Sequence, residues 1–206
     1  FKGTILVSVA CALLAGSIGT MIGYAVSKNR RSRWANYVNS VAFLPYLMPS
    51  IAVGVAFFIL FSTEKLNLFN TYTLLIIVGT VKYIPFASRS ALSSMMQLSG
   101  EIEEAAIIQD IPWHKRMLNI IIPIQKTSIM SGYLLPFITC VRELTLFMLL
   151  CSQTKIITTM LDYFDEMGLY AFSSGINLIL IVFILICNAL INKLTGASLD
   201  KGIGGE

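Results

Sequence analysis

Three ionisable residues, Lys82, Arg142 and Glu143, stand inside long apolar runs, where a charge could contact a polar solute or form a buried ion pair. Placing one charged side chain in hydrocarbon costs ~2.5–3.5 kcal/mol, so each of these residues needs a partner or a water-filled cavity. Lys82 precedes Arg89 by seven residues, so its long side chain could also reach a polar membrane face. On a helix, the neighbours Arg142 and Glu143 point about 100° apart and do not form a simple pair. All three are candidates for function, with ion pairing inside the structure as the alternative.

The sequence contains no pattern typical of metal binding or of ATP hydrolysis. Its four cysteines lie in or beside apolar runs, without a CxxC pair and without a histidine close by. Cysteines in such surroundings behave as small hydrophobic residues. The phosphate-binding pattern GxxxxGK[ST] does not occur in the 206 residues. We therefore expect no metal site, no cofactor and no catalytic residue in this chain, which is predicted not to be an enzyme.

The composition is that of a chain dissolved in lipid. Hydrophobic residues make up 56% of the sequence and charged residues 13%, too few to cover a soluble globule of this size. The net charge of +4 comes from 15 basic and 11 acidic residues, and the basic ones form no stripe that could follow phosphates. The composition therefore favours a membrane protein and argues against nucleic-acid binding.

Apolar runs of bilayer length predict an all-α, polytopic membrane protein with five transmembrane helices. The predicted spans cover residues 4–27, 41–62, 71–88, 127–151 and 174–192. The spans contain four prolines, at which we expect kinks or, alternatively, hinges: Pro45, Pro49, Pro85 and Pro136. Residues 1–206 are predicted to form a single transmembrane domain. Because the sequence begins with Phe1 rather than methionine, we expect it to be a segment of a longer chain.

The charges between the spans predict the direction in which each span crosses. Residues 28–33 (KNRRSR) carry four positive charges and no acid, which the positive-inside rule assigns to the cytoplasm. The N-terminus is then outside, and both the segment 89–126 and the C-terminus are cytoplasmic. In the outer connection 152–173, apolar residues at helical spacing up to Gly168 predict a short helix on or in the outer membrane surface.

The segment 89–126 is too amphipathic for a flexible linker and too interrupted for a span. It reads as two short helices that are separated at Asp110-Ile111-Pro112, since proline disfavours helical geometry in the residue before it. Such a cytoplasmic hairpin is suited to docking a soluble partner. A hairpin that lies flat on the inner leaflet is the alternative.

One pattern in this hairpin resembles a known family. Glu104-Ala105-Ala106 is followed after three residues by Asp110 and after nine more by Ile120, with Pro123 completing the pattern. This is similar to the EAA loop (EAA-x3-G-x9-I-x-L-P) of binding-protein-dependent ABC importers. Asp110 replaces the usual glycine, but aspartate is one of the few other residues that tolerate positive φ. Ile122 replaces the usual leucine, a mild change.

The resemblance implies the fold, partners and site residues of a type I ABC importer permease in the bacterial plasma (inner) membrane. Glu104, Ala105, Ala106, Asp110 and Pro123 would contact an ATPase subunit or shape the coupling loop. Two ATPase subunits would bind ATP and Mg, a second permease half would complete the path, and an extracytoplasmic solute-binding protein would deliver the solute. Lys82, Arg142 and Glu143 would then face the translocation path or the interface between the halves.

The substrate expectation also rests on resemblance. Residues 82–90 (KYIPFASRS), 142–144 (REL) and 165–168 (DEMG) are most similar to the ferric-iron branch of these permeases. Related permeases for aminophosphonate, polyamine, thiamine or sulfate carry similar stretches, so these solutes are the alternatives. A non-transporting membrane scaffold that docks a soluble protein is the rival from another class.

Overall fold

The computed structural model describes residues 1–63, 68–151 and 156–195, and these residues contain helices and connections but no strand. The predicted all-α fold is confirmed. The elements, in chain order, are α1 (Lys2–Lys28), α2 (Arg33–Leu47), α3 (Ser50–Phe61), α4 (Tyr72–Gln97), α5 (Gly100–Ile108), α6 (Trp113–Arg116), the π-helical turn η2 (Met117–Ile121), α7 (Ile122–Ile124), α8 (Lys126–Val141), α9 (Ile157–Glu166) and α10 (Tyr170–Thr195).

The centre of the molecule is the packing of α1 against α4 and α8. The face of α1 that meets α4 carries glycines where the two backbones come closest. A Cβ atom at Gly19 would lie 2.5 Å from the Cβ of Ala87, and one at Gly23 would lie 2.6 Å from the amide nitrogen of Leu92. Small residues permit this close approach, which is how helices associate where water provides no driving force.

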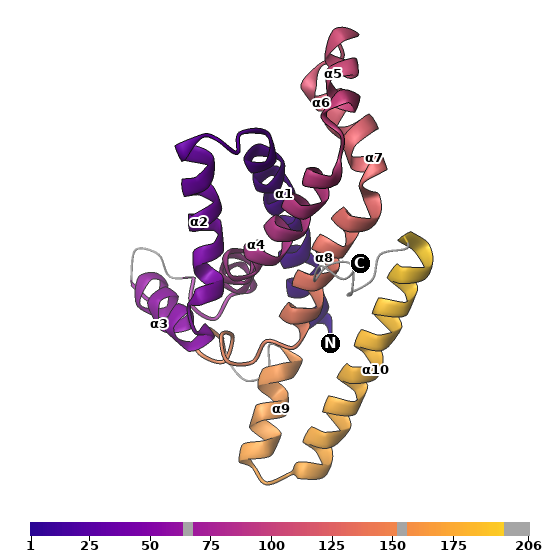
Figure 1. Ribbon diagram of the computed structural model, residues 1–206. Helices are drawn as coiled ribbons and strands as arrows, with labels where there is room; N and C mark the ends of the chain where they lie inside the picture. Colours follow the sequence, from indigo (N-terminus) through magenta and orange to yellow (C-terminus); the bar gives the residue numbers. More distant parts are fainter. Residues whose placement is uncertain (64–67, 152–155, 196–206) are drawn as a thin grey trace.

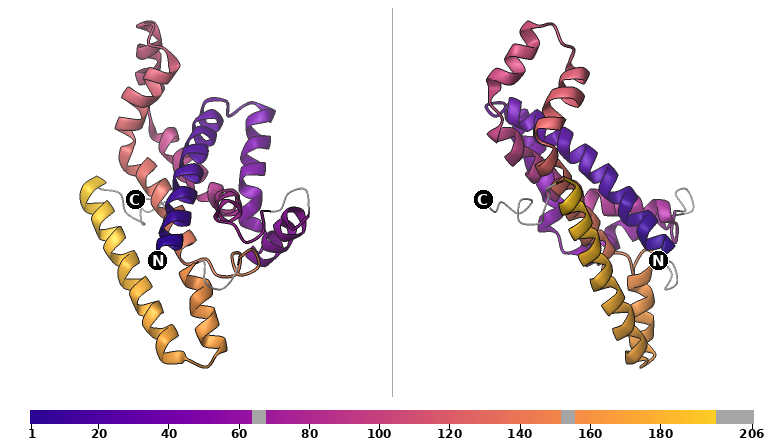
Figure 2. Two further views of the ribbon diagram at one scale, coloured as in Figure 1. Left: turned by 180° about the vertical axis from the view of Figure 1, so that it is seen from behind. Right: turned by 90° about the vertical axis from the view of Figure 1, so that its right-hand side faces the viewer.

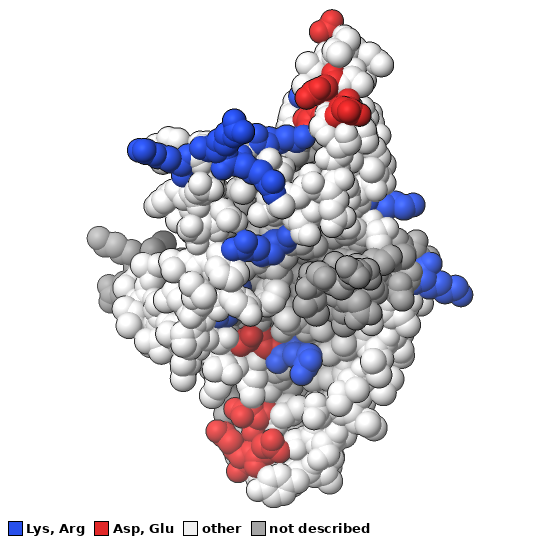
Figure 3. Space-filling model, in the orientation of Figure 1, with Lys and Arg blue, Asp and Glu red and all other residues white. Residues whose placement is uncertain are grey.

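The two ends of the molecule differ (Figures 1 and 2). A hairpin of α5 and α6 projects from one end, near the connection between α1 and α2, while α9 and the start of α10 form the opposite end. From there α10 runs back toward the hairpin end. Basic residues gather over the α1–α2 connection, and acidic residues over the hairpin and over α9 (Figure 3). The cluster of basic charge and the hairpin therefore share one end of the molecule.

The predicted second span, residues 41–62, is not one helix. It is divided between α2 and α3, which meet at an angle of 101°. The break falls at Met48 and Pro49: proline has no amide hydrogen for the helix ladder, and it forces the residue before it into an extended conformation, here ψ 132° at Met48. We call this break the elbow. The prolines of this span therefore do more than kink a continuous helix.

The predicted fourth span, residues 127–151, is also corrected. Its helix, α8, ends at Val141, and turns occupy residues 142–151. These turns still bury Leu146, Phe147 and Leu150 in the core. A buried irregular segment has the same apolar composition as a buried helix, so hydropathy alone could not separate the two.

Three helices in the described part of the chain are long and apolar enough to cross a membrane, namely α1, α4 and Tyr170–Leu190 of α10. Counting the bent α2–α3 pair as one span gives up to four. α8 has 16 residues, and α7 continues it at its N-terminal end in roughly the same direction (Figure 1). The predicted number of five spans therefore stays a prediction. A short helix in the predicted connection is confirmed as α9, and Gly168 follows it with a φ of +73°. Its location on the outer membrane surface stays a prediction.

Candidate functional site

The turn between α5 and α6 is built around Asp110, which has a φ of +52°. The amide of Asp110 donates to the carbonyl of Ile107 (2.9 Å), and the amide of Ile111 donates to that of Ala106 (3.1 Å). This pair of bonds is a Schellman motif, in which the residue after the helix cap takes a left-handed conformation and is usually glycine. The expectation that aspartate adopts positive φ at this position is confirmed, and Pro112 then begins α6.

The hairpin presents an apolar and acidic surface to its surroundings. Of the predicted coupling residues, Glu104, Ala105, Asp110 and Pro123 are exposed, whereas Ala106 is buried. Ile108 is 82% exposed, and further large apolar side chains lie open on the same hairpin, namely Ile107, Trp113 and Leu118. Exposed apolar side chains in such number on a projecting element are typical of a surface that contacts another protein or a membrane.

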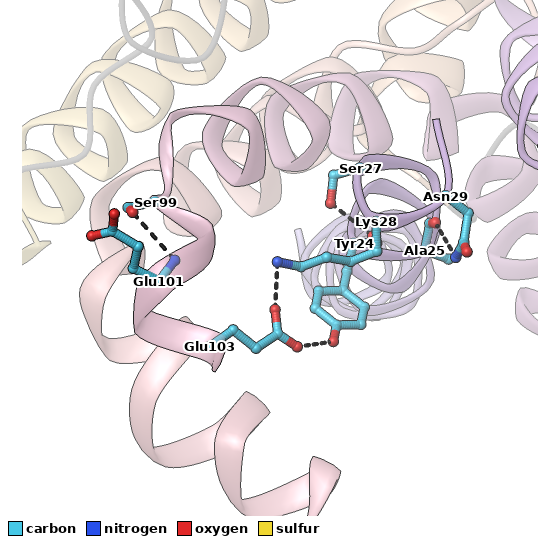
Figure 4. A network of polar contacts seen from close by, with 8 residues as sticks. All are labelled: Tyr24, Ala25, Ser27, Lys28, Asn29, Ser99, Glu101 and Glu103. Atoms are coloured by element: carbon cyan, nitrogen blue, oxygen red, sulfur yellow. Dashed lines mark hydrogen bonds and ion pairs between the residues drawn. The ribbon is translucent and has the colours of Figure 1, made fainter. Parts of the chain in front are cut away.

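The buried carboxylate of α5 is Glu103, a residue that is not among the predicted coupling residues. Its side chain points toward the end of α1 (Figure 4). The Tyr24 hydroxyl donates to Glu103 Oε1 at 2.5 Å, and the Lys28 ammonium forms an ion pair with Oε2. Burial acts to raise the pKa of Glu103, but the bonds from Lys28 and Tyr24 outweigh it and hold the pKa below its ordinary value.

A signal for this contact exists in the sequence, although it is weak. Tyr24 and Lys28 are four residues apart, so they share one face at the end of the first helix. Nothing local in the sequence indicates which of the nearby carboxylates in α5 they meet.

At the elbow, Lys82 is only 9% exposed and its ammonium contacts two backbone carbonyls. It donates to the carbonyl of Pro45 at 3.0 Å and to that of Met48 at 2.6 Å. In a continuous helix, the carbonyl of residue 45 would accept from the amide of residue 49, but Pro49 has none. Lys82 therefore satisfies the freed carbonyls from α4, and the alternative in which it reaches for a membrane face is wrong.

Arg142 and Glu143 follow the end of α8 instead of lying within it, so the helical geometry assumed for them does not apply. Glu143 accepts from the Tyr83 hydroxyl at 2.6 Å and from the amide of Leu146 at 3.0 Å. Arg142 is exposed. Together with Lys82, both residues line one cavity of about 380 Å³ beside the elbow. The structure thus brings the three predicted intramembrane charges to one place.

Residues 17–198 match the protein family described as "Binding-protein-dependent transport system inner membrane component". The chain belongs to this family. It is accordingly a permease subunit of an ABC importer and a multi-pass inner membrane protein, whose relatives are transport subunits and not enzymes themselves. Permeases of this family act in general with an ATPase and a binding protein.

Individual relatives of this permease carry different substrate names. A molybdate/tungstate transport system permease protein from Pyrococcus abyssi is 23% identical over 82% of this chain and 67% of its own length. A ferric transport system permease protein from Actinobacillus pleuropneumoniae is 22% identical over 83% of this chain and 25% of its own length. A trehalose/maltose transport system permease protein from Thermococcus litoralis is 28% identical over 69% of this chain and 50% of its own length. The chain thus spans about two thirds, a quarter and half of these relatives.

The permease buries three of its four cysteines and shows no metal cluster in the part of the chain that the structure describes. Cys11, Cys140 and Cys151 lie in the apolar core. Residues 1–63, 68–151 and 156–195 contain no group of three or more histidine, cysteine, aspartate or glutamate side chains that could hold a metal ion.

Proposed function

We propose that this permease forms one half of the translocation path of an ATP-driven importer and that an ATPase subunit docks on the α5–α6 hairpin. One observation carries the proposal: Glu104 and Ala105 are exposed beside Ile107, Ile108 and Trp113 on an element that projects from the bundle. A small side chain at 105 permits close approach of the partner, and the carboxylate of Glu104 can meet a basic residue of the partner. Asp110 and Pro123 shape the loop on either side of this surface.

In this proposal the hairpin is cytoplasmic, which is supported by its position near the basic residues 28–33 that the positive-inside rule assigns to the cytoplasm. The acidic end formed by α9 is then external, as is the N-terminus of the described chain, and α10 ends on the cytoplasmic side. Two ATPase subunits, which bind ATP and Mg²⁺, serve this chain and a second permease half, and an extracytoplasmic binding protein delivers the solute at the α9 end.

The proposed substrate is a small inorganic ion, with ferric iron as the first candidate because of the similar stretches at residues 82–90 and 142–144. A molybdate-type oxyanion is the second candidate, and the cavity charge favours it: Lys82 and Arg142 carry two positive charges against the single negative charge of Glu143. Uptake of radiolabelled ferric iron and of radiolabelled molybdate into proteoliposomes with the complete transporter separates the two candidates.

Docking is tested by co-purification of the ATPase with Ala105→Trp, in which a bulky ring blocks close approach. Asn36→Trp is the matched control, since Asn36 is also exposed and lies one turn into α2 at the same end of the molecule. We expect the ATPase to co-purify with the wild type and with the control but not with Ala105→Trp. An ATPase that never associates with the wild type would favour the scaffold, and one that stays bound to Ala105→Trp would exclude this docking surface.

A further inference from the structure

A buried acid, Glu103, links the α5–α6 hairpin to the membrane bundle. Of the acidic residues in α5, Glu101 and Glu104 are exposed, whereas Glu103 is only 6% exposed. The only other buried residue of α5 is Ala106. α5 packs sparsely against the other helices, so the contacts of Glu103 account for much of its attachment.

Three elements meet at this carboxylate. Tyr24 and Lys28, one turn apart near the end of α1, bind its two oxygen atoms (Figure 4). The ring of Tyr24 also lies against Trp113 of α6, with 6.2 Å between the ring centroids. A buried carboxylate that binds an ammonium and a hydroxyl has defined positions for both oxygens, so it fixes orientation as well as distance. We call this arrangement the Glu103 clamp.

The helix that the clamp holds, α1, is connected to the polar cavity through α4. α1 packs along α4 at Gly19 and Gly23, where the backbones are too close to slide without disturbing each other. α4 in turn carries Lys82, which holds the elbow, and Tyr83, which holds Glu143. A displacement of α5 can therefore reach the cavity through two tightly packed helices, without passing along the connection between α4 and α5.

We propose that Glu103 is a positioning residue for transport, which transmits movement of the ATPase-bound hairpin to α1 by way of Lys28 and Tyr24. This inference rests on the proposed function, because it requires an ATPase on the hairpin. It assigns different tasks to neighbouring acids: Glu104 faces the partner, while Glu103 faces the bundle. Loss of the clamp should leave the ATPase bound and active but release its control over the membrane helices.

The test uses the whole transporter, with its ATPase and binding protein, in proteoliposomes. Glu103→Gln removes the ion pair at constant shape, and Glu101→Gln removes an exposed charge from the same helix as a control. We measure ATPase co-purification and the ratio of ATP hydrolysis with and without binding protein. For Glu103→Gln we expect full co-purification and a loss of about tenfold in this ratio, the scale of a typical coupling free energy. Glu101→Gln should match the wild type.

A structural role alone predicts a different result. If Glu103 serves only folding, Glu103→Gln lowers the amount of complex but leaves the ratio in the remaining complex unchanged, and that outcome overturns the proposal. Should Glu103→Gln fail to fold, Lys28→Met and Tyr24→Phe test the same clamp from α1. The exchange Glu103→Lys with Lys28→Glu should restore the ratio. Failure of the wild type to bind any ATPase would instead refute the proposed function.

Discussion

Glu143 provides the negative charge of the cavity, and its two oxygen atoms have separate partners. One accepts from the Tyr83 hydroxyl and the other from the amide of Leu146, so the side chain also holds the turn that follows α8. A glutamine can accept from Leu146 with its carbonyl oxygen and donate to Tyr83 with its amide group. The charge of this residue can therefore be removed while its hydrogen bonds are kept.

We predict that Glu143→Gln changes uptake according to the sign of the solute. Without the carboxylate, only Lys82 and Arg142 remain charged at the cavity, which repels a cation and attracts an anion. Uptake of ferric iron should fall about tenfold, the effect of ~1.4 kcal/mol, while molybdate uptake stays at or above the wild-type rate. Uptake of each ion by the wild type and by Glu143→Gln is measured in parallel with ATP hydrolysis. Unchanged uptake of the transported ion would remove Glu143 from the path.

Glu103 gives a prediction about pH. Its lowered pKa means that the clamp contributes stability fully above the ordinary glutamate value of about 4.3, and that this contribution is lost as the pH falls through the lowered pKa. Lys28 and Tyr24 from α1 and Arg116 from α6 are the groups that face this carboxylate. Trp113 lies beside the clamp, so in a Trp34→Phe background its fluorescence should change at a pH below the ordinary glutamate pKa.

The control for this titration is Glu103→Gln in the same background, which lacks the titrating carboxylate. Its Trp113 emission should not show the transition. If the same transition persists, the fluorescence change does not come from the clamp.

At the scale of whole elements, the contact between α1 and α4 depends on the absence of side chains. We predict that Gly19→Ala destabilises the permease by about 1–3 kcal/mol, because the added Cβ overlaps Ala87. Gly175→Ala in α10 is the matched control, since a Cβ there meets nothing within 4 Å. That control should be neutral or stabilising, because alanine favours helices. Thermal unfolding in detergent measures both, and equal midpoints would contradict the close packing.

The elements that sequence could predict are those whose signal is local. The span of α1 follows from apolar length, α9 from helical spacing, and the turn after α5 from the tolerance of aspartate for positive φ. The elbow and the early end of α8 were not predicted, because an apolar run has the same composition whether it is straight, bent or irregular. The local cause of the elbow, Pro49, can be seen in the sequence. A proline in an apolar run, however, gives the same sequence pattern whether the helix is kinked or broken there.

The candidate site was predictable to a similar extent. The cost of burying charge singled out Lys82, Arg142 and Glu143, and the structure gathers them at one cavity. The carbonyl partners of Lys82 and the clamp at Glu103 could not be derived, since each joins segments that lie far apart in the sequence. The packing of α2 on α4 brings Lys82 to its carbonyl partners. The position of α5 beside the end of α1 brings Glu103 to Tyr24 and Lys28.

For the molecule as a whole, the distribution of charge predicts its orientation in the membrane. Residues 28–33 and the hairpin lie at one end and the acidic α9 at the other (Figure 3). In a background without cysteines, Glu104→Cys and Glu166→Cys place one thiol at each end, both at exposed positions. A membrane-impermeant thiol reagent applied to intact cells should label position 166 and spare 104. Labelling of 104 alone would reverse the orientation and exclude ATPase docking at the hairpin.

The elbow has a consequence for how this family diverges. Pro49 deletes a hydrogen-bond donor, and Lys82 supplies a replacement from another helix. A homologue with any amino acid other than proline at position 49 regains a main-chain amide that can bond to the carbonyl of residue 45. It then no longer needs the ammonium of Lys82, and an apolar residue can replace that lysine. Substitutions at the two positions should therefore be correlated across homologues, with the lysine retained chiefly where the proline is.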